Sequence, residues 1–219
     1  MLVSDYLSHI TKGEVKQLYL SDIGTTSPTV TQQANIDTLI VYINEANLEI
    51  HKHFGLLQKE YVLTDVTNNT LHSIPTDFLY AISATFNDGT EVAINDERQN
   101  FIDDIDYNVS ILFPAPFKVL VKGTDWLTPA RDDISIIYVS IPPVLTLTTD
   151  FADLPQVYNE ALYNYVAYKA HASVKGDMKA ENNTYYLRYN ESIKNIRLLG
   201  MRNSDNLDSN VKLTDRGFV

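Results

Sequence analysis

Apolar residues recur at helical spacing between about Asn35 and Phe54. They stand three or four positions apart, which places them on one face of a helix, and they are Ile36, Leu39, Ile40, Ile43, Ala46, Ile50 and Phe54. Asn35 or Asp37 is placed to cap the start of this helix, and Gly55 stands where a C-terminal cap belongs. Residues 1–24 predict one or two shorter helices that break near Gly13.

Short β-prone runs replace this pattern in the middle of the chain. They cover residues 60–66, 80–86, 91–94, 108–113, 117–122 and 134–140. Asn87-Asp88-Gly89 separates the second run from the third and predicts a hairpin turn. The run from Ile134 to Ser140 is the most apolar, which predicts a central strand covered on both faces.

A helical pattern returns after Pro142-Pro143. Leu154-Pro155 opens a helix that Gly176 interrupts, and a second helix is expected from about Asp177 to Leu199, with Gly200 after it. The residues beyond Gly200 are polar and poor in apolar side chains. We therefore expect a flexible C-terminal tail that is ordered by a partner.

These elements predict an α+β fold. A helical bundle, made of the N-terminal helices and a C-terminal helical hairpin, carries an inserted small antiparallel β-domain and a flexible C-terminal tail. The expected bounds are residues 1–57 and 142–200 for the bundle, 58–141 for the β-domain and 201–219 for the tail. The helices before and after the insertion must pack together, because neither set can bury its apolar face alone.

The composition limits the available chemistry. The chain has 219 residues and no cysteine, so disulfides, iron–sulfur clusters, thiolate zinc sites and cysteine nucleophiles are excluded. Its longest apolar run, residues 39–43, is far shorter than the ~20 residues that cross a bilayer. Residues 1–10 lack the pattern of a signal peptide. We expect a protein that is made in a cytoplasm and has no membrane contact.

The net charge of −11 bears on nucleic-acid binding. Lys and Arg are scattered along the chain, whereas proteins that wrap DNA cluster them to release counterions. Sequence-specific binding is therefore not expected. An acidic wall that DNA slides past without sticking is compatible with this charge.

The acidic loop around Asp103–Asp106 is the only place where the spacing approaches a metal motif. Two of its aspartates, with Asn108, match positions one, three and five of a calcium loop. Val109 and Ala115 stand where that loop requires Gly and Glu. A solvated acidic loop is the preferred interpretation, and a weak cation site there stays open.

The histidines and the possible nucleophiles do not indicate a metal site or a catalytic site either. His51 and His53 lie two residues apart near a helix end, so their side chains point about 200° apart and do not readily share a metal. We interpret them as helix-terminal residues stabilised by the C-terminal dipole. The chain has no G-x-S-x-G nucleophile motif, and it has neither a P-loop nor a G-x-G-x-x-G motif for binding phosphates. The sequence therefore predicts a protein that is not an enzyme and holds no metal or cofactor.

Tyrosine is the one compositional excess, with 14 in the chain and a concentration in the last two expected helices. Tyrosines on the core stripe are typical of buried packing. Those on other faces, such as Tyr163 and Tyr168, are typical of subunit contacts. The candidate interface residues are Tyr163, Tyr168, Tyr185, Trp126, Arg202 and Phe218.

Five local patterns, taken in order, resemble the head-to-tail adaptor family of tailed phages, which includes the tail tubular protein of short-tailed phages. The patterns are Tyr42-Ile43-Asn44-Glu45-Ala46, residues 71–79, residues 111–116, residues 137–146, and Leu154-Pro155 through Leu162 followed by Gly176-Asp177. Together they extend over about residues 35–199.

The resemblance implies a structural protein of the virion neck or tail. About twelve copies would close a head-to-tail ring that binds the portal and offers a platform to the next tail or nozzle component. DNA would pass through its channel. The last two helices would contact neighbouring subunits, the tail would dock on the portal or tail, and assembly would take place in the host cytoplasm.

Two other functions stay open. The chain could be a different neck or tail component, which binding to the portal would distinguish. It could also be a glycan- or receptor-binding module built on the β-domain, with Trp126 and Tyr138 as a sugar platform. Trp126 suits a loop-tip anchor on a neighbouring subunit equally well. Glycan titration with tryptophan fluorescence as the readout tests the glycan alternative.

Overall fold

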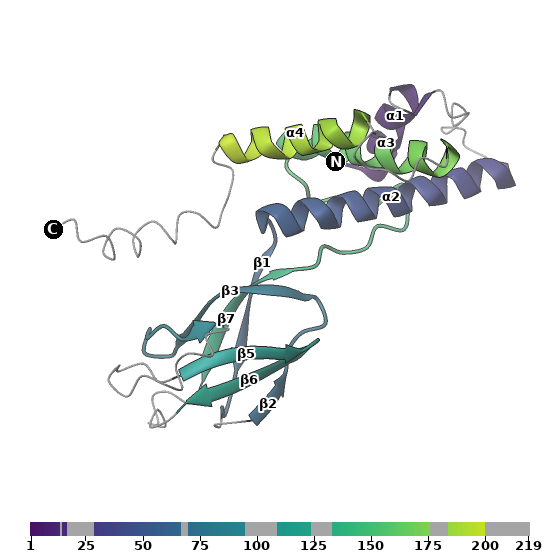
Figure 1. The fold of residues 1–219 in the computed structure, drawn as a ribbon. Helices are drawn as coiled ribbons and strands as arrows, with labels where there is room; N and C mark the ends of the chain where they lie inside the picture. The colour runs from purple at the N-terminus through teal and green to yellow at the C-terminus, as the bar shows by residue number, and fades with distance from the viewer. Residues whose placement is uncertain are drawn as a thin grey trace. The chain divides into compact units, whose positions relative to one another are not determined.

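The structure, a computed structural model, describes residues 1–13, 15–16, 29–66, 70–94, 109–123, 133–175 and 184–199. These residues form helices and two small sheets (Figure 1), which confirms the expected α+β class. They divide into a helical unit, with the residues up to Phe54 and from Pro142 onward, and a β unit from Gly55 to Ile141. The expected tail and the Asp103–Asp106 loop lie outside the described residues.

α3 is the central helix of the helical unit. The unit consists of α1 (Val3–Lys12), α2 (Val30–Phe54), the short 3-10 helix η3 (Gln156–Tyr158), α3 (Asn159–Lys175) and α4 (Thr184–Leu198). α3 packs against α1, α2 and α4, and Figure 1 shows α2 and α4 running along it. Buried side chains from these helices form one core, among them Ile10, Ile43, Ile50, Leu162, Val166 and Ile193. The helices on either side of the β unit thus bury one another's apolar faces.

α2 begins earlier than its apolar pattern indicates. Thr29 Oγ1 accepts a hydrogen bond from Gln32 N (3.3 Å), and Gln32 Oε1 accepts one from Thr29 N (2.8 Å). This reciprocal capping box starts the helix, so the expected cap at Asn35 or Asp37 is wrong. The first turn is largely exposed and therefore carries no apolar periodicity. Gly55 does end the helix, with a left-handed φ of +58° that glycine adopts without strain.

Two small sheets share one core in the β unit. Their strand orders are β1-β7-β3 and β2-β6-β5-β4. The strands are β1 (Gln58–Leu63), β2 (Thr70–Ser73), β3 (Phe78–Phe86), β4 (Ala93–Ile94), β5 (Val109–Ala115), β6 (Lys118–Gly123) and β7 (Ile134–Ser140). Ile136 and Tyr138 of the first sheet join Ile111 and Val121 of the second in a single buried apolar cluster. The inserted β-domain is therefore two-layered.

Two details of the β unit differ from expectation. The turn after Phe86 forms, with Gly89 at a φ of +84°, but the chain then crosses to the other sheet, where β4 pairs with β5 in parallel. β7 is the central strand of its sheet, yet Ile137 is 40% exposed. β7 is therefore not covered on both faces, and its apolar run includes a side chain that faces solvent.

Candidate functional site

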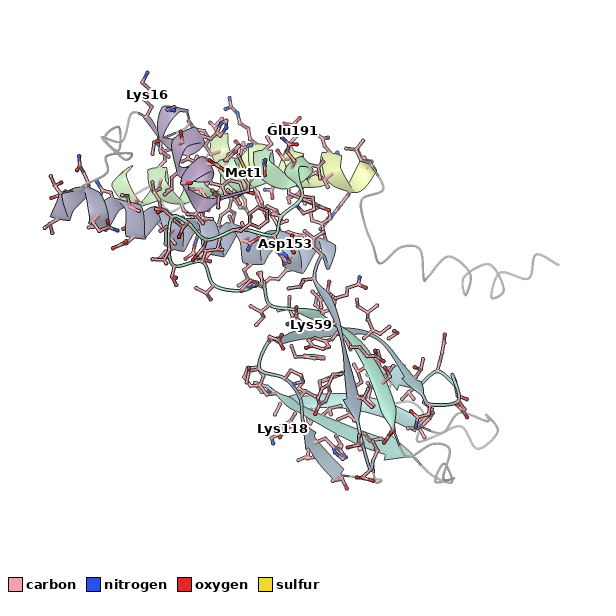
Figure 2. The ribbon with its side chains drawn as sticks, turned by 180° about the vertical axis from the view of Figure 1, so that it is seen from behind. Met1, Lys16, Lys59, Lys118, Asp153 and Glu191 are labelled. Atoms are coloured by element: carbon pink, nitrogen blue, oxygen red, sulfur yellow. The ribbon has the colours of Figure 1, made fainter. Side chains whose placement is uncertain are left out.

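A segment without helix or strand, residues 142–155, belongs to the helical unit, and we call it the strap. Asp153 marks it in Figure 2. Its attachment to α2 depends on Asn44, whose Nδ2 donates to the Leu145 carbonyl (2.7 Å) and whose Oδ1 accepts from the Leu145 N–H (2.8 Å). One side-chain amide therefore satisfies both backbone groups of a strap residue, as a neighbouring strand would.

The strap is also fixed at its far end. Ala152 N donates to the Met1 carbonyl (3.0 Å). The Asp150 carboxylate accepts hydrogen bonds from the N–H groups of Leu147 (2.8 Å) and Thr146 (2.6 Å). These bonds stabilise the charged form and lower the pKa of Asp150. The strap thus has a defined path although much of it faces solvent.

Three large apolar side chains of the strap face solvent. Val144, Leu147 and Phe151 are between 60% and 73% exposed. The only charged residues of the strap are Asp150 and Asp153. We call this surface the strap face. It combines exposed apolar area with a net charge of −2.

The outer side of α4 also exposes apolar side chains. Leu187, Leu198 and Leu199 are between 55% and 75% exposed. Lys194 lies between the first two on the same side of the helix, because positions 187, 194 and 198 are whole turns apart. We call this surface the α4 face. Glu191 lies on the same side of the helix as Lys194, so these two charges cancel on this face. Arg188 extends toward α3 and Arg197 donates to His53 of α2.

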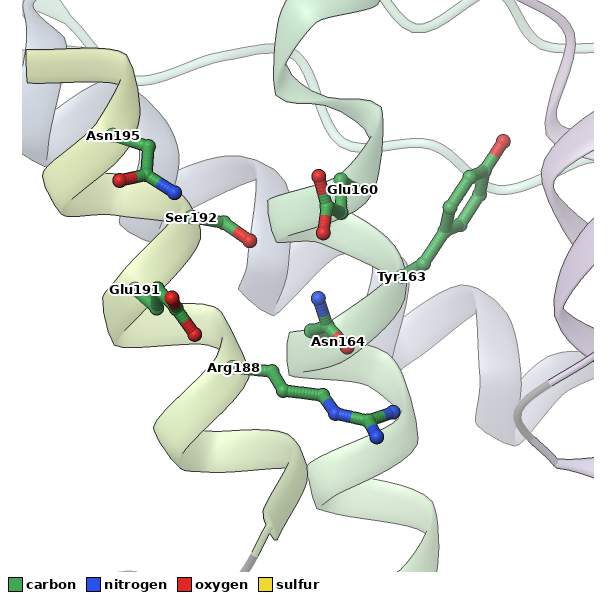
Figure 3. A pocket seen from close by; sticks show the side chains of 7 residues that line it. All are labelled: Glu160, Tyr163, Asn164, Arg188, Glu191, Ser192 and Asn195. Atoms are coloured by element: carbon green, nitrogen blue, oxygen red, sulfur yellow. The ribbon is translucent and has the colours of Figure 1, made fainter.

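A polar groove of about 370 Å³ lies between α3 and α4. In Figure 3, α4 and α1 flank α3, α2 passes behind it, and Arg188 extends from α4 toward α3. The groove offers carboxylates, amides, two hydroxyls and a guanidinium but no histidine, so its serine has no adjacent imidazole base. Its lining residues are Glu160, Tyr163, Asn164, Arg188, Glu191, Ser192 and Asn195.

Tyrosine rings fill the contact between α3 and α4 beside this groove. Tyr165 of α3 meets Tyr189 of α4 with ring centroids 5.1 Å apart, and Tyr168 of α3 meets Tyr186 of α4 at 5.0 Å. Both pairs are tilted or edge-on, the arrangements that aromatic rings favour. The cluster stiffens the helical hairpin.

Polar groups at the edge of the cluster connect α2 to α3. Lys169 Nζ lies 2.9 Å from the Glu45 carboxylate and 5.6 Å from the centroid of the Tyr165 ring. The hydrogen bond to Glu45 raises the pKa of Lys169. The hydroxyl of Tyr189 is buried without a hydrogen-bond partner among the described residues, and this burial raises the pKa of Tyr189.

The histidines at the end of α2 do not have the expected charge. His51 is buried, its Nδ1 lies 2.8 Å from the Asn47 carbonyl, and burial lowers the pKa of His51. Arg197 Nη2 donates to Nδ1 of His53 (2.8 Å), which ties α4 to α2. Burial, and then the charge of Arg197, lower the pKa of His53. Both histidines lie in the last turn of α2, as expected, but burial favours the neutral ring over the charged form that a helix dipole stabilises.

Neither a metal centre nor a membrane span emerges from the described part of the chain. No group of three or more potential ligands lies close enough there to hold a metal ion. No helix among the described residues is long and apolar enough to cross a membrane.

A family model described as SU10 adaptor protein matches residues 10–212, most of the chain. The chain belongs to this family. Its resemblance to phage head-to-tail adaptors is therefore confirmed, and it is a structural adaptor protein of a phage. No curated protein is similar enough to the chain to count as a match.

The interface candidates of this adaptor fall into two groups. Tyr163, Tyr168 and Tyr185 are half-buried and pack within the subunit. Tyr163 stacks on His9 of α1, Tyr168 belongs to the tyrosine cluster, and Tyr185 stacks on His171 at 4.9 Å. Their contact with other subunits stays a prediction. The other candidates lie outside the described residues, and they are Trp126, Arg202 and Phe218.

The prediction that Tyr138 forms part of a sugar-binding platform is wrong. It is 3% exposed, its ring stacks on Phe78 at 5.0 Å, and its hydroxyl donates to the Asp77 carboxylate (3.1 Å). Burial and the carboxylate raise the pKa of Tyr138 to about 12. A ring buried in this way has no free face on which a sugar could stack.

The sequence pattern did not predict the strap. Between Pro142-Pro143 and Leu154-Pro155 no helix or strand was expected. Val144, Leu145 and Leu147 are all apolar, yet only Leu145 is buried, so the local pattern did not indicate which of them faces solvent.

Proposed function

We propose that the adaptor assembles as a ring of about twelve copies between the portal and the next tail component, with a central channel for DNA. The membership of residues 10–212 in the adaptor family carries this proposal. A head-to-tail ring needs two different contact surfaces on each subunit, and the helical unit presents two exposed apolar surfaces, on the strap and on α4. No catalytic step is part of this function.

The charge of the chain supports passage of DNA. With a net charge of −11, a ring of many copies repels phosphates over most of its surface, and the repulsion decreases over roughly 10 Å at 0.1 M salt. DNA would therefore move through the channel without strong binding.

The division of labour between the two units follows from their surfaces. We assign neighbour contacts to the helical unit, residues 1–57 and 142–200, because the strap and α4 both belong to it and expose large apolar side chains. Portal or tail docking is assigned to the C-terminal residues 201–219, with Arg202 and Phe218 as candidate contacts. Trp126, from the inserted domain of residues 58–141, is the candidate anchor on a neighbour.

Native mass spectrometry of the purified chain, alone and mixed with the portal protein of the same phage, tests the function. A closed ring, or a monomer that assembles only on the portal, supports it. A monomer or small dimer that ignores the portal contradicts it. A ring that binds only tail-tube protein instead indicates a different neck or tail component.

A further inference from the structure

We propose that the polar groove between α3 and α4 binds the start of the C-terminal tail of the same chain, Arg202-Asn203-Ser204-Asp205. This segment lies outside the described residues, and the groove belongs to the helical unit. The contact forms within one subunit and does not rest on the proposed ring.

The floor of the groove has unused hydrogen-bonding capacity. Asn164 of α3 and Ser192 of α4 line it and are each only 6% exposed. Figure 3 shows the Ser192 hydroxyl pointing from α4 toward α3, with Asn164 on the facing helix. In the described part of the chain neither side chain has a hydrogen-bond partner, although buried polar groups normally have one. A peptide backbone supplies both donors and acceptors, as the pairing of Asn44 with Leu145 shows in the same unit.

Charged groups of opposite sign lie toward the two ends of the groove. Glu160 lies toward one end and Arg188 toward the other (Figure 3), and no ion pair joins either of them to another described residue. The remaining acidic residue, Glu191, belongs to the outer stripe of α4, where a lysine accompanies it. The start of the tail has a complementary order, because Arg202 precedes two small polar residues and Asp205 follows them. Charge complementarity at both ends sets the direction in which a segment binds.

The tail can reach this position by folding back along α4. Gly200 follows the helix and is the residue type that commonly reverses the chain there. The stretch of α4 that lines the groove, residues 188–195, rises about 10 Å along the helix axis. Residues 202–205 also span about 10 Å when they are extended. Side chains three positions apart in an extended segment point to opposite sides, so the arginine of the tail faces Glu160 on α3 while its aspartate faces Arg188 on α4.

This placement is compatible with the docking role proposed for the tail. Arg202 then contributes to docking by fixing the base of the tail on its own subunit. The residues beyond Asp205, with Phe218 among them, are left for the portal or the next tail component.

Limited proteolysis tests the contact in the intact chain. Trypsin cleaves after Arg202, and a synthetic peptide of residues 199–207 gives the intrinsic rate at the same bond. Cleavage of a segment that opens and closes rapidly follows the population of its open form. We expect cleavage after Arg202 to be about tenfold slower in the chain than in the peptide, roughly the combined effect of two exposed ion pairs. The protection should decrease as salt rises toward 1 M, because salt screens both pairs.

Substitutions in the groove leave the cleaved bond itself unchanged. Arg188→Gln and Glu160→Gln should each raise the rate after Arg202 about threefold or more. Lys194→Gln is the matched control, because it removes the same charge from the same helix at a position that does not line the groove. The control should leave the rate unchanged, and circular dichroism at 222 nm checks that each variant keeps its helices.

A rate equal to that of the free peptide would overturn the proposal. So would protection that the two groove variants leave intact, or that all three variants reduce alike. Protection that increases with protein concentration would place the segment on another subunit and would also overturn the contact within one chain.

Native mass spectrometry separates this contact from the proposed function. A ring whose Arg202 is cleaved as fast as the peptide overturns the contact alone. A protected Arg202 in a chain that forms no ring, with or without portal, supports the contact while the proposed function fails.

Discussion

Removal of the Asn44 side-chain amide should release the strap from α2. In Asn44→Ala, the N–H and carbonyl of Leu145 lose their partners at 2.8 and 2.7 Å. Each neutral hydrogen bond contributes about 1 kcal/mol. Leu145 is buried, so the unpaired groups add a desolvation cost, and we expect a total loss of about 2–3 kcal/mol in the free energy of unfolding of the helical unit. For a chain of this size the melting temperature should fall by roughly 5–10 °C.

Urea unfolding followed by circular dichroism at 222 nm measures this loss, and hydrogen exchange at the Leu145 amide locates it. Asn35→Ala is the matched control, because Asn35 lies on the same helix and its side chain makes no hydrogen bond in the described part of the chain. The control should change stability by less than 0.5 kcal/mol, roughly the limit for a surface substitution. An Asn44→Ala variant as stable as its parent, with Leu145 still protected from exchange, would refute the assignment of the strap's attachment to Asn44.

Three further perturbations test other parts of the structure. Tyr189→Phe removes a buried hydroxyl that has no hydrogen-bond partner among the described residues, so we expect urea unfolding to show unchanged or slightly higher stability. A loss above ~1 kcal/mol would show that the hydroxyl has a hydrogen bond in solution. The pKa of His53 is lowered in the folded state, so the stability that its neutral ring contributes is full above the unfolded pKa of about 6.5 and is lost as pH falls through the folded pKa. His53→Gln keeps an acceptor for Arg197 and should make the free energy of unfolding less dependent on pH between 7.5 and 5. An unchanged pH dependence would contradict this. Gly55→Ala puts a Cβ 3.2 Å from Val139 Cγ2 at a φ of +58°, so thermal unfolding should show a loss of about 1–2 kcal/mol, and no loss would mean that the turn relaxes.

Local periodicity was enough to locate the main elements of this adaptor. The apolar stripe of α2, the β-prone runs and the two C-terminal helical stretches are short-range patterns, so the residues that create them stand within a few positions of one another. The same short range explains the error at the start of α2, where Thr29 and Gln32 form the cap but the exposed first turn carries no apolar signal. The family resemblance extended over those same patterns and was confirmed by the match to residues 10–212.

The α+β class, the ends of several elements and the absence of thiol chemistry were therefore determined by the sequence alone. Only the tertiary structure decided that Asn44 binds a backbone segment about a hundred residues away, that His53 is a neutral acceptor for Arg197, and that Tyr138 is buried. It also decided which apolar side chains remain exposed on the strap and on α4. The physical reason is that burial and hydrogen bonding depend on partners that are distant in sequence, and a pattern along one segment does not reveal which distant segment will cover it.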